Sequence, residues 1–254
     1  GQGREPFPEP FVKQARGEHT ATIIFLHGFG AQGAGRGEFL ADKLNLPWCK
    51  IISPIAPKRG LQFGQVIQSW ASIDGLLRGQ LAELLRRGPS PSQITSVVHS
   101  LRMRLGEWVE EGGEGDVSEL FKAITHQGLA NIEGDEVDVG RNINHLLRLL
   151  HAEINAGIPP ERIILVGFSQ GGCVALECAL QLGMQLGGII ALSTWFPQSR
   201  GAALEGHVTH RRDRNVTAHV PPLMVCHGDA DWVVPYAHGK EVAERCSRLG
   251  LPST

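Results

Sequence analysis

A serine between two glycines is the first candidate for chemistry in this sequence. Gly167, Ser169 and Gly171 form the pattern G-x-S-x-G, which on its own is a weak indication of function. Here an apolar stretch at 162–166 (RIILV) precedes it and small residues follow it, which is the strand–turn–helix context that a nucleophilic serine requires. The N–H of Gln170 would then lie at a helix N-terminus and could stabilise an oxyanion. The alternative is that Ser169 only caps the helix.

A second motif can supply the other half of an oxyanion site. His27, Gly28, Phe29 and Gly30 follow a β-branched apolar run at 20–26 (TATIIFL), which predicts a buried strand. In α/β-hydrolases the loop after this strand provides an oxyanion donor through a backbone N–H. We expect Phe29 to be that donor and the side chain of His27, which precedes the turn, to be structural.

Two carboxylates, two residues apart, follow a later strand. Asp229 and Asp231 come after the apolar stretch 222–226 (PLMVC). A carboxylate at a strand end suits a triad acid, which orients a histidine and stabilises its charged form. Either aspartate taken alone could instead be an ordinary turn residue. Their position after Ser169 agrees with the chain order Ser, Asp, His of this class of hydrolase.

Strands and helices alternate along the chain around these motifs. The apolar stretches are short and continuous, which is typical of strands buried on both faces of a parallel sheet. We therefore predict an α/β fold with a mostly parallel central sheet, helices on both faces, and ligands at the carboxyl ends of the strands. The expected strands are 20–26, 49–53, 162–166, 188–192 and 222–226, and the expected helices are 38–43, 139–154, 169–183 and 236–249.

The composition is that of a globular protein. Of the 254 residues, 42% are hydrophobic and 20% are charged, and the formal net charge is −2, which argues against wholesale disorder and against nucleic acid as the main partner. No apolar run is long enough to span a bilayer, and residues 1–18 are a polar, proline-rich extension without the apolar core of a signal peptide. Five cysteines without a CxxC pair argue against a disulfide framework and a zinc site. We expect a single domain over 1–254 in the cytoplasm.

Residues 76–139 interrupt the alternation of strands and helices. They contain helix-like stretches at 76–87 and 94–110 and an acidic, glycine-rich patch at 110–116. One interpretation is a surface insertion, which a fold tolerates because loop-closure entropy grows slowly with length. The other interpretation is a lid or docking element beside the active site.

Together these motifs closely resemble those of the acyl-protein thioesterase and small carboxylesterase family of α/β-hydrolases. The resemblance covers residues 21–76 and 139–248. It depends on FLHGFG, the pair Ser69-Trp70, GIPPERIILVGFSQGG, ALSTWFP and HGDADWVVP. The combination of GFSQGG with HGDxDxxVP is far more specific than G-x-S-x-G alone.

The resemblance implies a role for each residue of the site. Ser169 would be the nucleophile and Asp231 the triad acid, with Asp229 a structural neighbour. The backbone N–H groups of Phe29 and Gln170 would form the oxyanion hole. No metal or organic cofactor is implied.

The resemblance also implies a substrate class. We expect hydrolysis of acyl thioesters or esters, above all the depalmitoylation of S-acylated proteins, with peripheral membrane contact as a further expectation. The alternatives are hydrolysis of small esters or lysophospholipids and, from another class, non-catalytic binding of acyl chains. An acyl chain needs an apolar channel. Its expected walls, each of which could instead be a core residue, are Leu61, Phe63, Trp70, Trp195 and Phe196.

The sequence departs from the family pattern at its end as well as in the insertion. The family's catalytic histidine lies on a loop after one further strand, and this sequence ends at Thr254 before such a strand. His238, which follows Asp231, falls in the last expected helix and is a poor candidate for the base. His207, His210 and His219 precede the acid and would break the chain order, although geometry rather than order defines a triad. We therefore expect a C-terminally truncated form of an active hydrolase whose chain continues past Thr254, rather than a natural pseudoenzyme.

Overall fold

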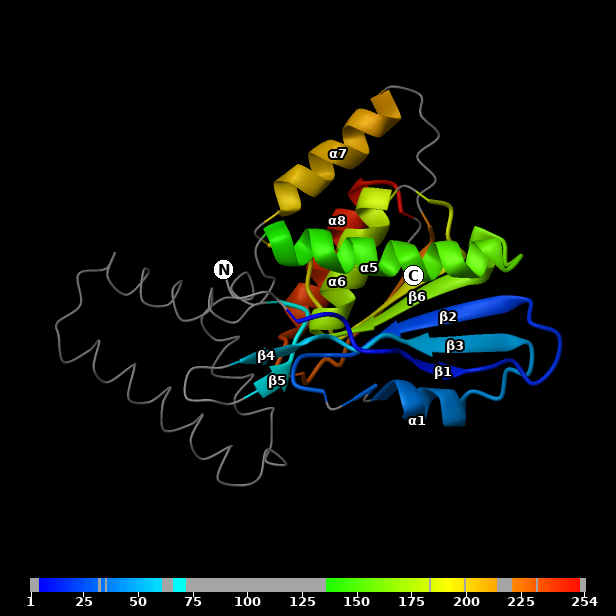
Figure 1. The fold of residues 1–254 in the computed structure, drawn as a ribbon. Helices are drawn as coiled ribbons and strands as arrows, with labels where there is room; N and C mark the ends of the chain where they lie inside the picture. Colours follow the sequence, from blue (N-terminus) through cyan, green and yellow to red (C-terminus); the bar gives the residue numbers. More distant parts are fainter. Residues whose placement is uncertain are drawn as a thin grey trace, which may run out of the picture.

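A mostly parallel sheet forms the centre of the protein. The computed structural model describes residues 5–31, 33–34, 36–60, 66–71, 136–182, 184–198, 200–213, 221–231 and 233–251. Six strands of this part pair in the order β1-β3-β2-β6-β7-β8, and β1 alone of them is antiparallel to its neighbour (Figure 1). The strands are β1 (Phe11–Lys13), β2 (Ala21–Leu26), β3 (Cys49–Ser53), β6 (Ile163–Phe168), β7 (Gly188–Leu192) and β8 (Leu223–Cys226).

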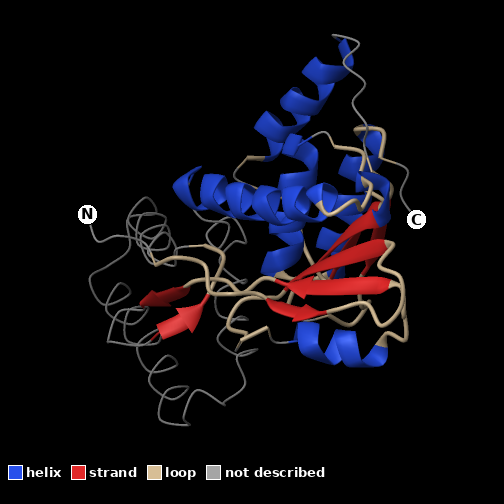
Figure 2. Cartoon of the chain, turned by 45° about the vertical axis from the view of Figure 1, so that its right-hand side comes forward, coloured by secondary structure: helices blue, strands red, loops and turns tan. Residues whose placement is uncertain are grey.

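Helices lie on both sides of this sheet (Figure 2). Helix α1 (Arg36–Lys43) packs on one face, against β1 and β3. The longer helices share the core on the other face. They are α5 (Glu136–Asn155), α6 (Gln170–Leu182), α7 (Gly201–Asp213) and α8 (Tyr236–Arg248). The α/β fold predicted from the sequence, with a mostly parallel sheet, is confirmed.

The two faces of β2 explain why its sequence is continuously apolar. Ile24 and Leu26 belong to the core beneath α5 and α6, whereas Ile23 and Phe25 belong to the smaller core beneath α1. All four side chains are buried. Successive side chains of a strand point to opposite faces, so a strand covered on both sides needs apolar residues at every position.

Some elements were absent from the sequence prediction. Strand β1 lies in the stretch predicted as an N-terminal extension and pairs with β3. A separate antiparallel pair is formed by β4 (Lys58–Gly60) and β5 (Val66–Gln68). Helix α7 and the short 3₁₀ helix η2 (Pro160–Arg162) were also not predicted. Of the stretch 76–139, residues 76–135 lie outside the described residues, so its interpretation as insertion or lid stays a prediction.

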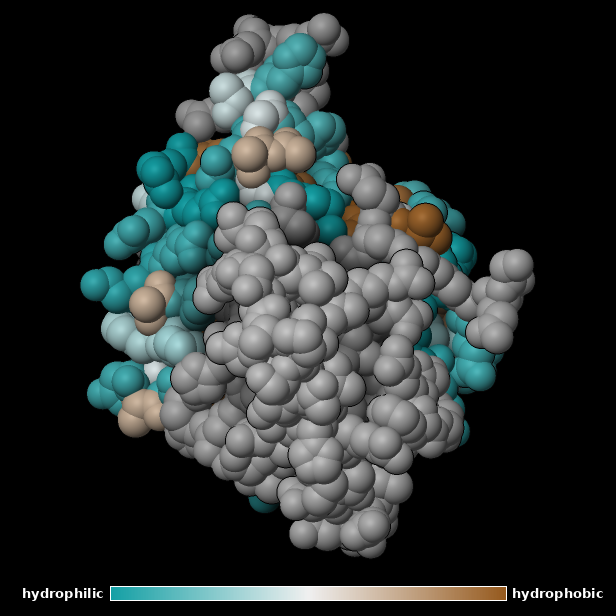
Figure 3. Space-filling model, turned by 90° about the vertical axis from the view of Figure 1, so that its left-hand side faces the viewer, coloured by the Kyte–Doolittle hydropathy of each residue, from teal (hydrophilic) through white to brown (hydrophobic). Residues whose placement is uncertain are grey.

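All five cysteines are free thiols. Burial raises the pKa of Cys178 and of Cys246 to about 12, so both thiols stay protonated and behave as small apolar groups. Within the described ranges no helix is both long and apolar enough to span a bilayer. On the face drawn in Figure 3 the described side chains are mostly hydrophilic, and apolar groups form small separate patches.

Candidate active site

Ser169 stands on a sharp turn between β6 and α6. Its backbone φ of 54° lies in the left-handed region that residues other than glycine seldom adopt. A methyl group on Gly167 would lie 2.5 Å from the carbonyl oxygen of Gly171, and one on Gly171 would lie 2.4 Å from that of His27. Strand β6, the start of α6 and the end of β2 therefore approach too closely for any side chain at these two positions. Ser169 occupies the strand–turn–helix position that its motif predicted.

Backbone hydrogen bonds hold this strained turn in place. The N–H of Ser169 donates to the carbonyl oxygen of Leu192 at the end of β7 (2.9 Å). The carbonyl oxygen of Ser169 accepts from the hydroxyl of Thr194 (2.7 Å) and from the N–H of Gly172 (2.9 Å). Thr194 is completely buried. The N–H of Cys173 also donates to the Ser169 carbonyl oxygen (3.2 Å). Strain of this kind persists only where the surroundings over-determine it, and these four hydrogen-bond partners do so here.

The loop after β2 lies directly beside the serine. A methyl group on Gly28 would come within 3.3 Å of Ser169 Cβ. Gly30 has φ 73° and donates its N–H to the carbonyl oxygen of Gln68 (3.0 Å). Phe29, the expected oxyanion donor, lies between these two glycines and is buried. The loop therefore brings the backbone of Phe29 to the same edge of the sheet as Ser169.

His27 is a structural residue of this loop. Its Nδ1 lies 2.7 Å from the carbonyl oxygen of Gly28, and its Nε2 lies 3.0 Å from the backbone nitrogen of Ala56. These partners assign the proton to Nδ1, because a carbonyl can only accept and an amide can only donate. Burial lowers the pKa of His27, against the opposing effect of the Gly28 hydrogen bond. The neutral ring thus connects the loop to the segment after β3.

The side chain of Gln170 connects α6 to the segment around Trp70. Its Oε1 accepts from the N–H of Trp70 (3.1 Å), and its Nε2 donates to the hydroxyl of Ser69 (3.1 Å). The indole N–H of Trp70 donates to the carbonyl oxygen of His27 (2.8 Å), and Asn142 on α5 donates to the carbonyl oxygen of Trp70 (2.9 Å). One buried network therefore joins the loop after β2, the start of α6, and α5.

An ion pair anchors the same segment from the other side. Arg59 on β4 lies 2.8 Å from a carboxylate oxygen of Asp138 near the start of α5, and both side chains are buried. The Nε of Arg59 also donates to the carbonyl oxygen of Ser69 (3.4 Å). Neither partner was predicted from the sequence as a site residue, and neither were Thr194 and Asn142. Thr194 lies in a family-like segment, whereas the other three carry no local signal.

The two aspartates after β8 differ in their surroundings. Oδ1 of Asp231 accepts from the N–H groups of Val233 (2.9 Å) and Val234 (3.0 Å). Its Oδ2 lies 3.6 Å from Nε2 of His227. Asp229 is exposed. Asp231 is thus the carboxylate held in one orientation, as a triad acid would be.

His227 supports this turn and is poorly placed to act as a base. Its side chain is only 2% exposed, and its Nε2 lies 2.6 Å from the carbonyl oxygen of Val234. A methyl group on Gly239 would lie 2.5 Å from the ring, so α8 packs tightly on the imidazole. Within the described residues His227 is the one histidine at ion-pair distance from Asp231. The catalytic base is therefore not assigned to any of the described residues.

Of the other histidines considered as the base, His238 alone was predicted to lie in a helix, and it does. His238 is in α8, with its Nδ1 3.7 Å from Glu241, and His207 and His210 are in α7. His219 lies outside the described residues. In the described ranges no group of three His, Cys, Asp or Glu side chains is placed to hold a metal ion.

Strand register brings the site residues to one edge of the sheet. Phe168 pairs with Leu192, and Leu192 pairs with Cys226, so β6, β7 and β8 end level with one another. Adjacent strands are about 4.8 Å apart, which puts the ends of β6 and β8 about 10 Å apart. Ser169 and the Asp231 turn thus follow strands that end at the same edge of the sheet. The catalytic roles of these residues, and of the amides of Phe29 and Gln170, stay predictions.

The three expected channel walls that lie within the described residues are core residues in this structure. Trp70, Trp195 and Phe196 are completely buried, and the guanidinium of Arg245 lies 4.0 Å from the Phe196 ring centroid. This burial favours the alternative that the sequence left open, that they are simply core. Leu61 and Phe63 lie outside the described residues, and a channel role for any of the five stays a prediction.

Comparison with known proteins agrees with this geometry. Residues 8–84 and 125–251 match the phospholipase/carboxylesterase family. Acyl-protein thioesterase 1 of Gibberella zeae is 30% identical over 243 residues, which are 95% of this chain and 82% of that protein. Acyl-protein thioesterase 1 of Yarrowia lipolytica is 29% identical over 240 residues, 92% of this chain and 79% of that protein. The crystal structure of Zea mays acyl-protein thioesterase 2 has the same fold, with a TM-score of 0.59 and 23% identity over 97% of this chain and 89% of that one.

Proposed function

The chain belongs to the phospholipase/carboxylesterase family, and from this premise we propose that it is a serine hydrolase of acyl thioesters or esters, with S-acylated proteins as its main substrates. The observation that carries the proposal is the left-handed turn at Ser169, packed against the loop that contains Phe29. The names of the two fungal relatives support the choice of thioesters.

The proposed reaction begins at the hydroxyl of Ser169. A histidine base removes its proton while Oγ attacks the acyl carbonyl carbon, and the carbonyl electrons move onto oxygen. The N–H groups of Phe29 and Gln170 stabilise this oxyanion. The oxyanion then collapses, the thiolate or alkoxide leaves and takes the proton from the imidazolium, and an acyl-enzyme remains. Water, activated by the same imidazole, hydrolyses the acyl-enzyme and restores Ser169.

Asp231 would orient the base and stabilise its charged form. Two backbone amides already bind Oδ1, so Oδ2 is the oxygen that can accept from an imidazole N–H. The carboxylate side chain is 17% exposed, and partial burial strengthens its attraction to an imidazolium compared with the same pair in water. This arrangement agrees with the triad in which a buried aspartate holds the histidine tautomer.

A fluorophosphonate probe tests the nucleophile in the full-length protein. We expect the probe to label Ser169, and Ser169→Ala to abolish both labelling and thioester hydrolysis. Ser247→Ala changes an exposed serine on α8 and should leave both unchanged. Labelling that persists in Ser169→Ala would overturn the assignment.

Substrate preference tests the acyl chemistry. We expect kcat/KM for a palmitoylated cysteine peptide to exceed that for a short-chain ester, because binding energy along the acyl chain lowers the barrier for the long substrate. The reverse order would make the protein a small-ester carboxylesterase. Fatty-acid binding that survives Ser169→Ala, with no turnover by the unsubstituted protein, would make it a binding protein.

We propose the cytoplasm as the place of action. The five free thiols support a reducing compartment. Cell fractionation with an antibody to the protein tests this, and recovery from the secretory compartments would contradict it.

A further inference from the structure

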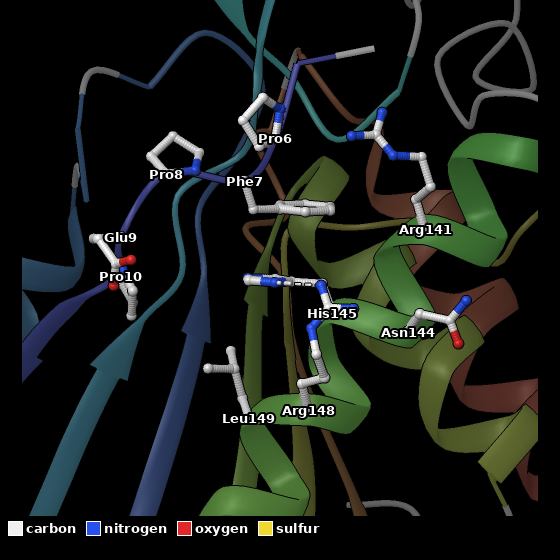
Figure 4. A pocket seen from close by; sticks show the side chains of 10 residues that line it. All are labelled: Pro6, Phe7, Pro8, Glu9, Pro10, Arg141, Asn144, His145, Arg148 and Leu149. Carbon is white, nitrogen blue, oxygen red and sulfur yellow. Dashed lines mark hydrogen bonds between the residues drawn. The ribbon is translucent and has the colours of Figure 1, made fainter. Parts of the chain in front are cut away.

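A cavity of about 590 Å³ lies between the N-terminal segment and α5 (Figure 4). The proline-rich residues 6–10 form one wall, and Arg141, His145 and Arg148 of α5 line the other. A volume of this size suits a small organic ligand. Neither Ser169 nor Asp231 lines the cavity, so it is separate from the proposed catalytic residues.

Stacked rings make part of this wall rigid. The Phe7 ring lies parallel to the imidazole of His145, at 4.0 Å between centroids and 3° between planes. The guanidinium of Arg141 lies 5.5 Å from the Phe7 centroid and donates to the carbonyl oxygen of Glu5. A long cationic side chain that is already positioned loses less conformational entropy when it binds a ligand.

The charge around the cavity is mainly positive. Arg141 and Arg148 line it with a single carboxylate, that of Glu9. Arg148 is exposed, and in the described part of the chain no ion pair to a carboxylate engages its guanidinium. Its Nη2 lies 3.5 Å from Nδ1 of His145. The other N–H groups of Arg148 can therefore donate to an anion here.

His145 contributes a second unused donor. A guanidinium has no acceptor, so its contact with Nδ1 leaves the ring proton on Nε2. That nitrogen is buried and has no hydrogen-bond partner among the described residues, and the residue is only 8% exposed. Burial, followed by the charge of Arg148, lowers the pKa of His145 to about 4. The imidazole is thus a neutral N–H donor at pH 7, and Arg141, Arg148 and Glu9 are the charged groups that line the cavity with it.

We propose that this cavity binds a small organic anion whose phosphate or carboxylate oxygens contact Arg148, Arg141 and the N–H of His145. The prolines of residues 6–10 and Leu149 would pack against its apolar body. The inference depends on the juxtaposition of two guanidinium groups and one unsatisfied buried N–H around a cavity of ligand size. Planar guanidinium forks match the oxygens of such anions.

Calorimetry with phenyl phosphate tests the proposal. We expect a Kd of about 1 mM or tighter, and a loss of at least about tenfold in Arg148→Gln, because hydrogen bonds to charged groups are strong. Arg248→Gln removes the same charge from an exposed position on α8 and should bind as the unsubstituted protein does. Equal losses in the two variants, or no binding at about 10 mM, would overturn the proposal.

Two further measurements distinguish a specific small-anion site from a general attraction of anions to this face. His145→Phe preserves a ring against Phe7 but removes the N–H, and we expect weaker binding with an unchanged Tm. Inorganic phosphate should bind more weakly than phenyl phosphate, because it lacks the apolar body. If phosphatidic acid vesicles bound in an Arg148-dependent way while phenyl phosphate did not, the face would be a membrane contact and the small-anion site would be refuted.

Discussion

The contact between α6 and β2 makes a quantitative prediction for Gly171→Ala. The new methyl group would lie 2.4 Å from the carbonyl oxygens of both Leu26 and His27, where ordinary contacts lie at 3.4–4 Å. These oxygens belong to the backbone at the end of a central strand, so neither can rotate away. Overpacking in a well-packed core costs about 1–3 kcal/mol, and here the overlap is with two backbone atoms. We expect the free energy of unfolding to fall by about 3 kcal/mol.

The matched control is Gly206→Ala in α7. A methyl group at this exposed position meets nothing within 4 Å, so only helix propensity changes, and we expect a gain of about 0.5–1 kcal/mol. Urea unfolding followed by circular dichroism measures both changes. If Gly171→Ala changed the free energy of unfolding by less than about 1 kcal/mol, the close approach of α6 to β2, and with it the geometry at Ser169, would be wrong.

Three further predictions concern the site and the α5 face. Thr194→Val removes the hydroxyl that binds the Ser169 carbonyl, so the free energy of unfolding should fall by about 1 kcal/mol and kcat should fall several-fold. Thr194→Ser keeps a hydroxyl and should restore kcat. Equal kcat in the two variants would contradict this. Asp231→Asn should lower kcat of the full-length protein about 10³–10⁴-fold, and a comparable loss in Asp229→Asn would contradict the choice between the two aspartates. The pKa of His145 is lowered from 6.5 to about 4, so the unfolded chain takes up the proton before the folded one as the pH falls. The free energy of unfolding should therefore fall by up to about 3 kcal/mol between pH 6.5 and pH 4. Urea unfolding measures this, and the same fall in His145→Phe would refute this origin.

The buried strands could be predicted because burial on both faces leaves a local signal. The prediction placed strands at 49–53 and 188–192, and β3 and β7 have these bounds. Strand β1 has only three residues and follows a proline-rich stretch. It is a strand because it pairs with β3, and the local sequence around β1 does not indicate this pairing. Helix α7 was not predicted because Leu204 and Val208 are its only buried large apolar residues among those described, and two positions make a weak periodicity.

The position of the candidate site was predictable for a different reason. Motifs at strand ends carry a local requirement: the glycines beside Ser169 are needed wherever strand and helix approach so closely. The contacts that support the site join residues far apart in the chain, as Arg59 and Asp138 do across 79 positions. In the sequence, nothing in the residues next to either of them marks it as a supporting residue. Only the fold reveals that they are partners.

The burial of Trp70 has a physical reason that the channel interpretation did not anticipate. Its indole N–H holds the carbonyl of His27, immediately before the loop that contains Phe29, and its backbone N–H is held by the side chain of Gln170. The two segments that carry the expected oxyanion donors are thus connected through one residue. An oxyanion hole works only if both donors are set at a fixed separation before the reaction. Trp70 therefore joins the two segments, and the packing around its fully buried side chain holds it in place.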